Sequence, residues 1–364
     1  MILSGYRVVT PAGLLDGGRV TVSDGRIAEV AAGAPAGAAT PYLLPGFVDM
    51  HVHGGGGHTF TTGDPDEARR AAAFHLRHGT TTLLASLVTA PHPLLAAATG
   101  RYAPLVADGT IAGLHFEGPY LARARCGAQN PAHLRDPDRS ELAALLDLGG
   151  VRMVTIAPEL PGALDAIRLL AARGVVAAVG HTDATHAQTR AAIEAGATVA
   201  THLFNAMPPV HHRAPGPVVA LLDAPTVTCE LVADGVHLDD GTVAFAARTA
   251  AGGAAFVTDA IGAAGMPDGR YDLGGLAVDV REGEARLAEG GAIAGSTLTL
   301  DAALRRAVDH GMSIVDAARL AATNPARALG LGDRGAIEPG RRADLIELDT
   351  ELRVTRVMRG GAWL

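Results

Sequence analysis

Short apolar runs recur through the middle of the chain and alternate with segments of helical periodicity. The eight runs cover residues 43–53, 79–89, 110–121, 151–159, 174–182, 197–207, 226–238 and 253–261. Helical segments follow most of them, for example at 65–78 and 184–195. Continuous apolar strands that alternate with helices are typical of a parallel sheet covered on both faces. Eight of them in this length predict an α/β fold, a (β/α)8 barrel of the TIM type.

An open doubly wound sheet is the alternative to a barrel. Such a sheet usually carries a Gly-rich phosphate-binding loop after its first strand. Here the four glycines at 54–57 follow the first apolar run, and no nucleotide-binding fingerprint comes after them. This absence favours the barrel.

Both ends of the chain show a different, alternating pattern of apolar and polar residues. Three short alternating segments lie between residues 7 and 30, and two more lie between residues 343 and 357. This alternation predicts strands. Because an isolated hairpin is only marginally stable in water, we expect the two ends to combine. The prediction is a small β-sandwich domain from residues 1–43 and 335–364, with residues 44–334 forming the barrel.

The composition is that of a globular protein and excludes several kinds of chemistry. Hydrophobic residues make up 48% of the 364 positions and charged residues 19%. All 30 basic side chains are arginine, so a lysine Schiff base, a P-loop lysine and a carbamylated lysine bridging two metals are excluded. The net charge is −8 and no basic stripe is present, which argues against a nucleic-acid partner.

The two cysteines and the apolar runs indicate the compartment. Cys126 and Cys229 do not form a disulfide framework and suit a reducing cytoplasm. The N-terminus lacks the pattern of a signal peptide, and no apolar run approaches the roughly 20 residues needed to span a bilayer. We therefore expect a soluble cytoplasmic protein with no membrane partner.

Candidate chemistry gathers where the predicted strands end, which is where a barrel places its catalytic groups. The residues at these ends are His51, His53, Glu117, His181, His202 and Asp259. Imidazole and carboxylate ligands suit zinc or a related divalent metal, and a carboxylate that is not a ligand can move protons. Each residue alone has a structural explanation, such as a turn residue or a helix cap. Their coincidence at five strand ends favours a metal site.

The same segments carry a family resemblance. Residues 44–54, Leu-Pro-Gly-Phe-Val-Asp-Met-His-Val-His-Gly, resemble the opening strand of the amidohydrolase superfamily. The segments at 115–120, 180–184, 201–207, 211–216, 258–260 and 294–298 resemble the N-acetylglucosamine-6-phosphate deacetylases. The Phe-Asn-Ala-Met and His-His-Arg stretches among them are quite specific. The resemblance extends from about residue 43 to 330 in the family order and supports the predicted barrel.

The resemblance implies a metal centre. Glu117, His181 and His202 would hold a catalytic divalent ion, and His51 and His53, with Glu117 bridging, would hold a second. One or two ions per subunit both remain open. Zinc is expected, with iron, manganese, cobalt and cadmium as alternatives. The absence of lysine agrees with Glu117 as the anionic ligand.

The resemblance also implies a substrate and a homodimer. Asn205, the backbone of Ala206, His237 and Arg213 would contact a sugar phosphate, with Arg213 reaching the site of the neighbouring subunit. Arginine matches phosphate oxygens with its planar fork. The implied reaction converts N-acetylglucosamine 6-phosphate to glucosamine 6-phosphate and acetate in amino-sugar catabolism. Asp259 would accept the proton of the attacking water and return it to the leaving amine.

One loop departs from the family pattern. It reads Cys126-Gly-Ala-Gln129-Asn-Pro, where relatives carry histidine in place of Gln129. Glutamine can donate a hydrogen bond to the substrate carbonyl or a sugar hydroxyl but cannot carry a positive charge. A second substrate therefore stays open: another N-acetyl amino sugar phosphate, such as the galactosamine epimer. A non-catalytic sugar-phosphate-binding protein fits less well, because every expected ligand is present.

Overall fold

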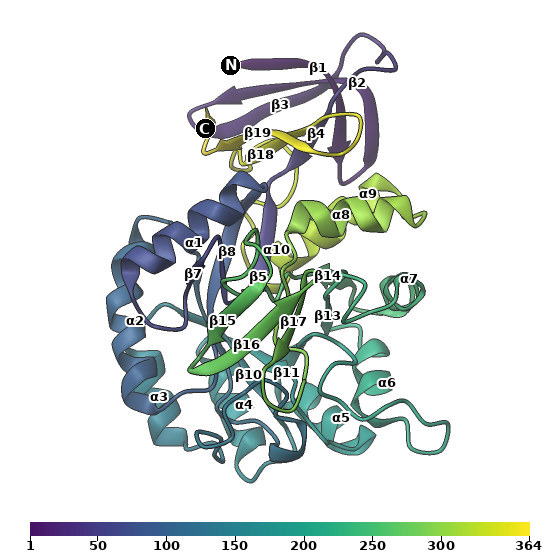
Figure 1. Cartoon of the computed structure of the whole chain (residues 1–364). Helices are drawn as coiled ribbons and strands as arrows, with labels where there is room; N and C mark the ends of the chain where they lie inside the picture. Colours follow the sequence, from purple (N-terminus) through teal and green to yellow (C-terminus); the bar gives the residue numbers. More distant parts are fainter.

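Eight parallel strands form the central sheet of the computed structural model, which describes residues 1–364 (Figure 1). In order across the sheet they are β5 (Phe47–Val52), β8 (Thr80–Leu87), β9 (Gly113–Glu117), β10 (Val151–Ile156), β11 (Val176–Val179), β12 (Ala197–Ala200), β13 (Thr228–Leu231) and β14 (Ala254–Phe256). Each lies within one of the eight predicted apolar runs. The predicted (β/α)8 barrel is confirmed.

The barrel closes where its first and last strands meet. Just beyond β14, the backbone N–H of Asp259 donates to the carbonyl of His51 at 2.9 Å, and that of His53 donates to Ala260 at 2.8 Å. These bonds join the carboxyl ends of β5 and β14. The carboxyl end of the barrel, where the metal site is predicted, is thus closed by backbone bonds of His51, His53 and Asp259, which are themselves predicted site residues.

Helices surround the barrel (Figure 1), and α1, α3, α5, α7 and α9 begin at a side-chain cap. The Asp64 carboxylate accepts backbone N–H groups at the start of α1, and Thr185 forms a capping box with Gln188 at the start of α5. The helices are α1 (Pro65–Arg77), α2 (His92–Ala107), α3 (Arg139–Asp147), α4 (Ala163–Ala172), α5 (His186–Ala195), α6 (Gly216–Leu222), α7 (Asp240–Thr249), α8 (Leu300–Asp309), α9 (Ile314–Ala318) and α10 (Asn324–Ala328), with the short 3-10 helix η1 (Arg123–Arg125) and the π-helix η2 (Arg319–Thr323).

Both ends of the chain contribute to one further sheet of seven strands. Its order is β20 (Ala362–Trp363), β19 (Val354–Arg359), β18 (Leu345–Leu348), β4 (Tyr42–Pro45), β1 (Ile2–Thr10), β2 (Gly13–Ser23) and β3 (Arg26–Ala32). The strand β4 joins the two halves, because it pairs with β18 on one side and β1 on the other. The small β-domain built from both termini is confirmed. Its boundary after residue 43 stays a prediction, and β4 extends across it.

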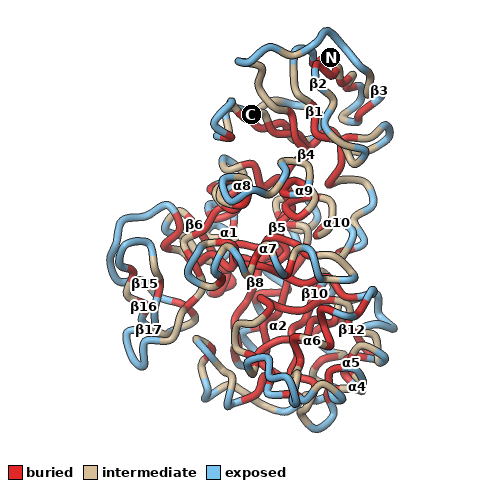
Figure 2. The backbone as a smooth tube through the Cα atoms, turned by 90° about the vertical axis from the view of Figure 1, so that its right-hand side faces the viewer, coloured by how far each residue is buried: buried red, intermediate tan, exposed pale blue.

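Two small sheets were not predicted. One is the hairpin of β6 (Gly54–Gly55) and β7 (His58–Thr59), and the other consists of β15 (Gly269–Leu273), β16 (Leu276–Arg281) and β17 (Glu284–Leu287). The second packs on Val88 and Ile261 through its own small apolar core. Figure 2 shows it at the side of the molecule, more exposed than the barrel strands.

Burial follows the expected layers. All eight residues of β8 and all six of β5 are buried, and the barrel strands form the red centre of Figure 2. None of the helices combines the length and apolar character needed to cross a membrane.

Candidate metal centre and substrate cavity

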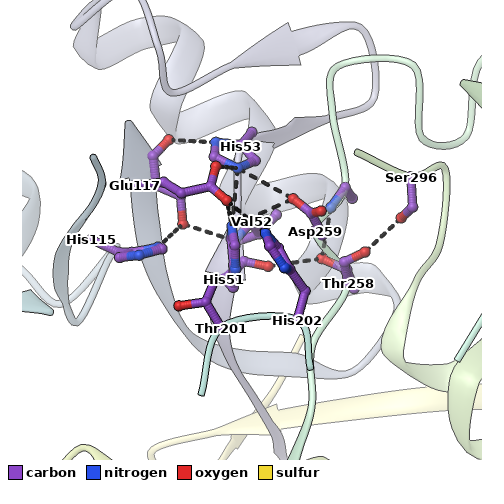
Figure 3. Close-up of polar contacts among 12 residues, drawn as sticks. His51, Val52, His53, His115, Glu117, Thr201, His202, Thr258, Asp259 and Ser296 are labelled. Atoms are coloured by element: carbon purple, nitrogen blue, oxygen red, sulfur yellow. Dashed lines mark hydrogen bonds and ion pairs between the residues drawn. The ribbon is translucent and has the colours of Figure 1, made fainter. Parts of the chain in front are cut away.

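Glu117 lies at the centre of the predicted ligands. Its Oε1 atom is 3.0 Å from both His181 Nε2 and His202 Nε2. Its Oε2 atom is 3.2 Å from His53 Nε2, and His51 Nε2 lies 3.5 Å from Oε1. These side chains form two groups of three potential ligands that share Glu117. Figure 3 shows four of them, His51, His53, Glu117 and His202. The structure therefore brings together all five residues predicted to bind metal.

Three of the four histidines are held in the tautomer that a metal ligand needs. The Nδ1 atom of His181 faces the carbonyl of Arg125 at 2.9 Å, and that of His53 faces the carbonyl of Ser86 at 3.2 Å. His51 Nδ1 lies 3.0 Å from the carboxylate of Glu230. Because these oxygens only accept hydrogen bonds, each Nδ1 carries the proton and each Nε2 presents its lone pair.

The spacing of these nitrogens indicates a cation. His51 Nε2 lies 3.1 Å from His53 Nε2, and His181 Nε2 lies 3.1 Å from His202 Nε2. Two lone pairs at this distance repel each other unless a proton or a metal ion lies between them. The donor set of imidazoles and one shared carboxylate suits one or two divalent ions.

The electrostatics of the site point the same way. When no metal ion is bound, His53 Nε2 takes up a proton instead: burial lowers the pKa of His53, but hydrogen bonds to Asp259 and Glu117 and their charges raise it overall to about 9. Burial raises the pKa of Glu117, but the charge of His51 and hydrogen bonds from His181 and His202 bring it well below its usual value. The buried carboxylates thus attract positive charge, which a divalent ion supplies.

Four residues of the candidate site hold a strained backbone: Ala206, with a φ angle of 52°, and three metal-ligand or proton-transfer candidates. His181, His202 and Asp259 have φ angles of 47°, 26° and 50°, in the left-handed region that residues other than glycine rarely adopt. Such strain costs of order 1–3 kcal/mol per residue and persists only where the surroundings enforce it. His181, His202 and Asp259 lie two or three residues beyond the ends of β11, β12 and β14, so this strain is concentrated at the candidate site.

Asp259 faces the two histidines of the first strand. Its Oδ1 atom is 3.4 Å from His51 Nε2 and 3.3 Å from His53 Nε2 (Figure 3). Burial raises its pKa, but the charge of His51 and the hydrogen bond from His53 lower the pKa below the ordinary value overall. Asp259 is therefore ionised and able to accept a proton. Ser296 supports the turn by donating to the carbonyl of Thr258 at 2.6 Å.

A cavity of about 320 Å³ opens above these groups. Among the residues lining it are His53, Glu117, Gln129, His181, His202, Asn205, Ala206, His237 and Asp259. His51 lies beneath, fully buried. The cavity therefore joins the metal-binding and proton-transfer candidates to Asn205, Ala206 and His237, three of the four residues that the resemblance assigns to contacts with the sugar phosphate.

The fourth of these residues, Arg213, lies elsewhere. It is exposed on the loop after β12, and its guanidinium bonds to the neighbouring His212 at 2.7 Å. It does not line the cavity of its own chain. The prediction that it reaches a second subunit stays a prediction.

The amide of Gln129 is occupied at both ends. Its Oε1 accepts the backbone N–H of Thr89 at 2.7 Å, and its Nε2 donates to Glu117 Oε2 at 2.5 Å. The backbone donor fixes the orientation of the amide. Gln129 thus lines the cavity as expected, but its donor is directed to Glu117.

Several polar residues around the site were not predicted. Arg125 is the one arginine lining the cavity, and its guanidinium pairs with Asp183 at 2.8 Å. The sequence feature that could have identified Arg125 is its position in the same loop as Gln129. Glu230 is fully buried inside β13, and Asp49 is buried inside β5, where burial raises its pKa to about 7. Because these two carboxylates lie within apolar strands, their position at the site gave no sequence signal.

A parallel barrel with histidines and carboxylates gathered at its strand ends defines a metal-dependent hydrolase. The model of the amidohydrolase family matches residues 42–364. The chain belongs to this family.

Relatives of known activity match almost the whole chain. Two structures of N-acetyl-D-glucosamine-6-phosphate deacetylase from Mycobacterium smegmatis are 48% identical, cover 100% of this chain and 100% and 98% of theirs, and superpose with a TM-score of 0.96. One of them, a variant, is in complex with N-acetyl-D-glucosamine-6-phosphate. N-acetylgalactosamine-6-phosphate deacetylase of Escherichia coli O157:H7 is 38% identical over 98% of this chain and 97% of its own. N-acetylglucosamine-6-phosphate deacetylase of Lysinibacillus sphaericus is 33% identical over 99% and 97%.

Proposed function

We propose that this chain is a deacetylase that hydrolyses N-acetylglucosamine 6-phosphate to glucosamine 6-phosphate and acetate. The observation that carries the proposal is the cluster of Glu117, His181, His202, His51 and His53 beside Asp259 at the floor of the cavity. The 48% identity to a deacetylase of this substrate, over the whole of both chains, supports it.

The histidines and Glu117 would hold one or two divalent ions, with zinc as the expected metal. Such an ion acidifies water and polarises the scissile carbonyl. Asp259 is the catalytic proton carrier of the chain. Its ionised carboxylate takes a proton from the attacking water and delivers it to the amine nitrogen as the C–N bond breaks.

The cavity mouth would bind the sugar phosphate. Asn205, the backbone N–H of Ala206 and His237 supply donors for its oxygens. His237 Nδ1 lies 2.8 Å from Asp234, and its Nε2 lies 3.8 Å from Asp259. Burial lowers the pKa of His237, but these carboxylates raise it overall, and the protonated ring can donate from Nε2 as well. Since Arg125 is neutralised by Asp183, a phosphate needs a further cation. Arg213 of a second copy would supply it in a homodimer.

A comparison of Asp259→Asn with the wild-type enzyme tests the proton carrier. Asparagine keeps the size of the side chain but accepts no proton, so turnover should fall by about a hundredfold or more. Metal content and substrate affinity should persist. Acetate release, metal analysis and calorimetric titration measure the three quantities. Wild-type turnover in the variant would remove Asp259 from the mechanism.

The galactosamine epimer is the second candidate substrate. The 38% identity to an N-acetylgalactosamine-6-phosphate deacetylase supports it. The specificity constants kcat/KM for both epimers and for unphosphorylated N-acetylglucosamine decide between them. Preference for the glucosamine derivative supports the main proposal. A higher kcat/KM for the galactosamine epimer would leave the proposed reaction unchanged and would show that the epimer is the substrate.

A cytoplasmic location completes the proposal. Cys126 and Cys229 are both free thiols, as expected in a reducing compartment. Fractionation of cells producing the protein tests this, and recovery outside the cytoplasm would contradict it.

A further inference from the structure

Glu230 is a buried carboxylate that the proposed reaction does not use. It lies in β13 between Cys229 and Leu231, and its side chain has no exposed surface. A buried carboxylate is costly unless hydrogen bonds and charges compensate it. Its partners therefore indicate why the barrel contains it.

Those partners belong to both halves of the metal centre. The Oε2 atom lies 3.0 Å from His51 Nδ1 and accepts the backbone N–H of His202 at 3.0 Å. The backbone carbonyl of Glu230 also accepts the N–H of Leu203 at 2.9 Å. One residue of β13 thus holds two consecutive N–H groups of the turn that carries His202. The rings of His51 and His202 lie side by side, with their centroids 5.7 Å apart (Figure 3).

The contacts of Glu230 fix the tautomer of His51 and the backbone of the turn that carries His202. Because Oε2 can only accept, His51 Nδ1 must donate, and its Nε2 is left to face Glu117 and Asp259. The turn at His202 has a strained φ of 26°, which needs restraint from its surroundings. The bonds to Glu230 supply that restraint. The ring of His202 receives no such help, because its Nδ1 has no hydrogen-bond partner.

We propose that Glu230 is a positioning residue that aligns His51 and His202, one ligand from each half of the metal centre. It acts through the reach and direction of one carboxylate oxygen. Its other oxygen, Oε1, is buried without a partner. This inference rests on the proposed metal-dependent function.

Two substitutions separate position from charge. Glu230→Gln keeps the length of the side chain and an oxygen that accepts both bonds, but removes the charge. Glu230→Asp keeps the charge but withdraws the oxygen by about 1.5 Å, out of reach of both donors. Both changes are small in volume, which favours folding. Asp301→Ala is the control, because Asp301 is a buried carboxylate that accepts from His78 Nδ1 at 3.2 Å and does not line the cavity.

Metal-free protein titrated with Co²⁺ against a chromophoric chelator measures affinity, and the visible spectrum of Co²⁺ reports histidine ligation. Glu230→Asp should bind about 10- to 100-fold more weakly, with an altered spectrum. Glu230→Gln should stay nearer the wild type in both, and Asp301→Ala should match it.

Wild-type affinity in Glu230→Asp, or affinity in Glu230→Gln no better than in Glu230→Asp, would overturn the positioning role. If the wild-type chain itself bound no Co²⁺, the metal-dependent function would fail as well, so the two failures are distinguishable.

Discussion

His75 makes the fold sensitive to acid, and its effect can be calculated. This histidine of α1 is fully buried, its Nε2 bonds to the carbonyl of Gly54 at 2.9 Å, and its Nδ1 has no partner. The pKa of His75 is lowered from 6.5 to about 4. Burial is the main cause and the charge of His78 adds to it, whereas the hydrogen bond to Gly54 acts in the opposite direction. His75 is therefore neutral in the folded chain across the physiological range.

The sign and size of the effect follow from linkage. A group with a folded pKa below its unfolded value of 6.5 binds a proton first in the unfolded chain. Stability is therefore present above pH 6.5 and is lost as the pH falls toward 4. At about pH 5 the two pKa values give a loss of about 2 kcal/mol. For a chain of this length this lowers Tm by about 3 °C.

The test compares His75→Gln with the wild-type protein, both free of metal. Glutamine can donate to Gly54 but does not titrate. Tm is recorded by circular dichroism at about pH 7.5 and about pH 5 for both proteins and for a His133→Gln control, a histidine outside the core. The wild type and the control should lose about 3 °C more on acidification than His75→Gln. Equal losses in all three would refute the reasoning.

Two further substitutions test packing beside the site and within the core. At Gly180 a Cβ atom would lie 2.6 Å from Cβ of Thr201, so Gly180→Ala should displace His181 and lower the metal content. Full metal content by elemental analysis would contradict this. The buried hydroxyl of Tyr102 donates to the carbonyl of Phe60 at 2.6 Å. Tyr102→Phe should therefore cost about 1–3 kcal/mol, and an unchanged urea-unfolding midpoint would contradict this.

The barrel was predictable because its strands are short runs of mostly apolar or β-branched residues that are buried on both faces. In β8 all eight residues are buried, although Thr80, Thr81, Thr82 and Ser86 are polar. The sheet of β15, β16 and β17 has a weaker signal. The Gly274-Gly275 turn that joins β15 to β16 is a hairpin signal, but the flanking strands are largely exposed. Without an apolar run, they did not stand out as a sheet.

The ligands were predictable for the same reason that the barrel was. Polar residues that end an apolar run are conspicuous, and barrel topology assembles them at one end. Glu230 lacks this signal, because the apolar residues 231–233 follow it and its partner His51 is far away in the sequence. The orientation of Gln129 also depends on a distant donor, the backbone of Thr89. Sequence patterns report what a strand presents at its end, whereas these contacts exist only after closure.

The absence of lysine affects the charge balance of the buried site. Glu117, Asp259 and Glu230 lie together with almost no exposed surface, and no basic side chain of fixed charge pairs with any of them. Histidines and metal ions must therefore balance their charge. The one arginine lining the cavity, Arg125, is already paired with Asp183. The same shortage of cations that favours a divalent metal at the cavity floor is the reason for proposing that Arg213 of a second copy meets the phosphate.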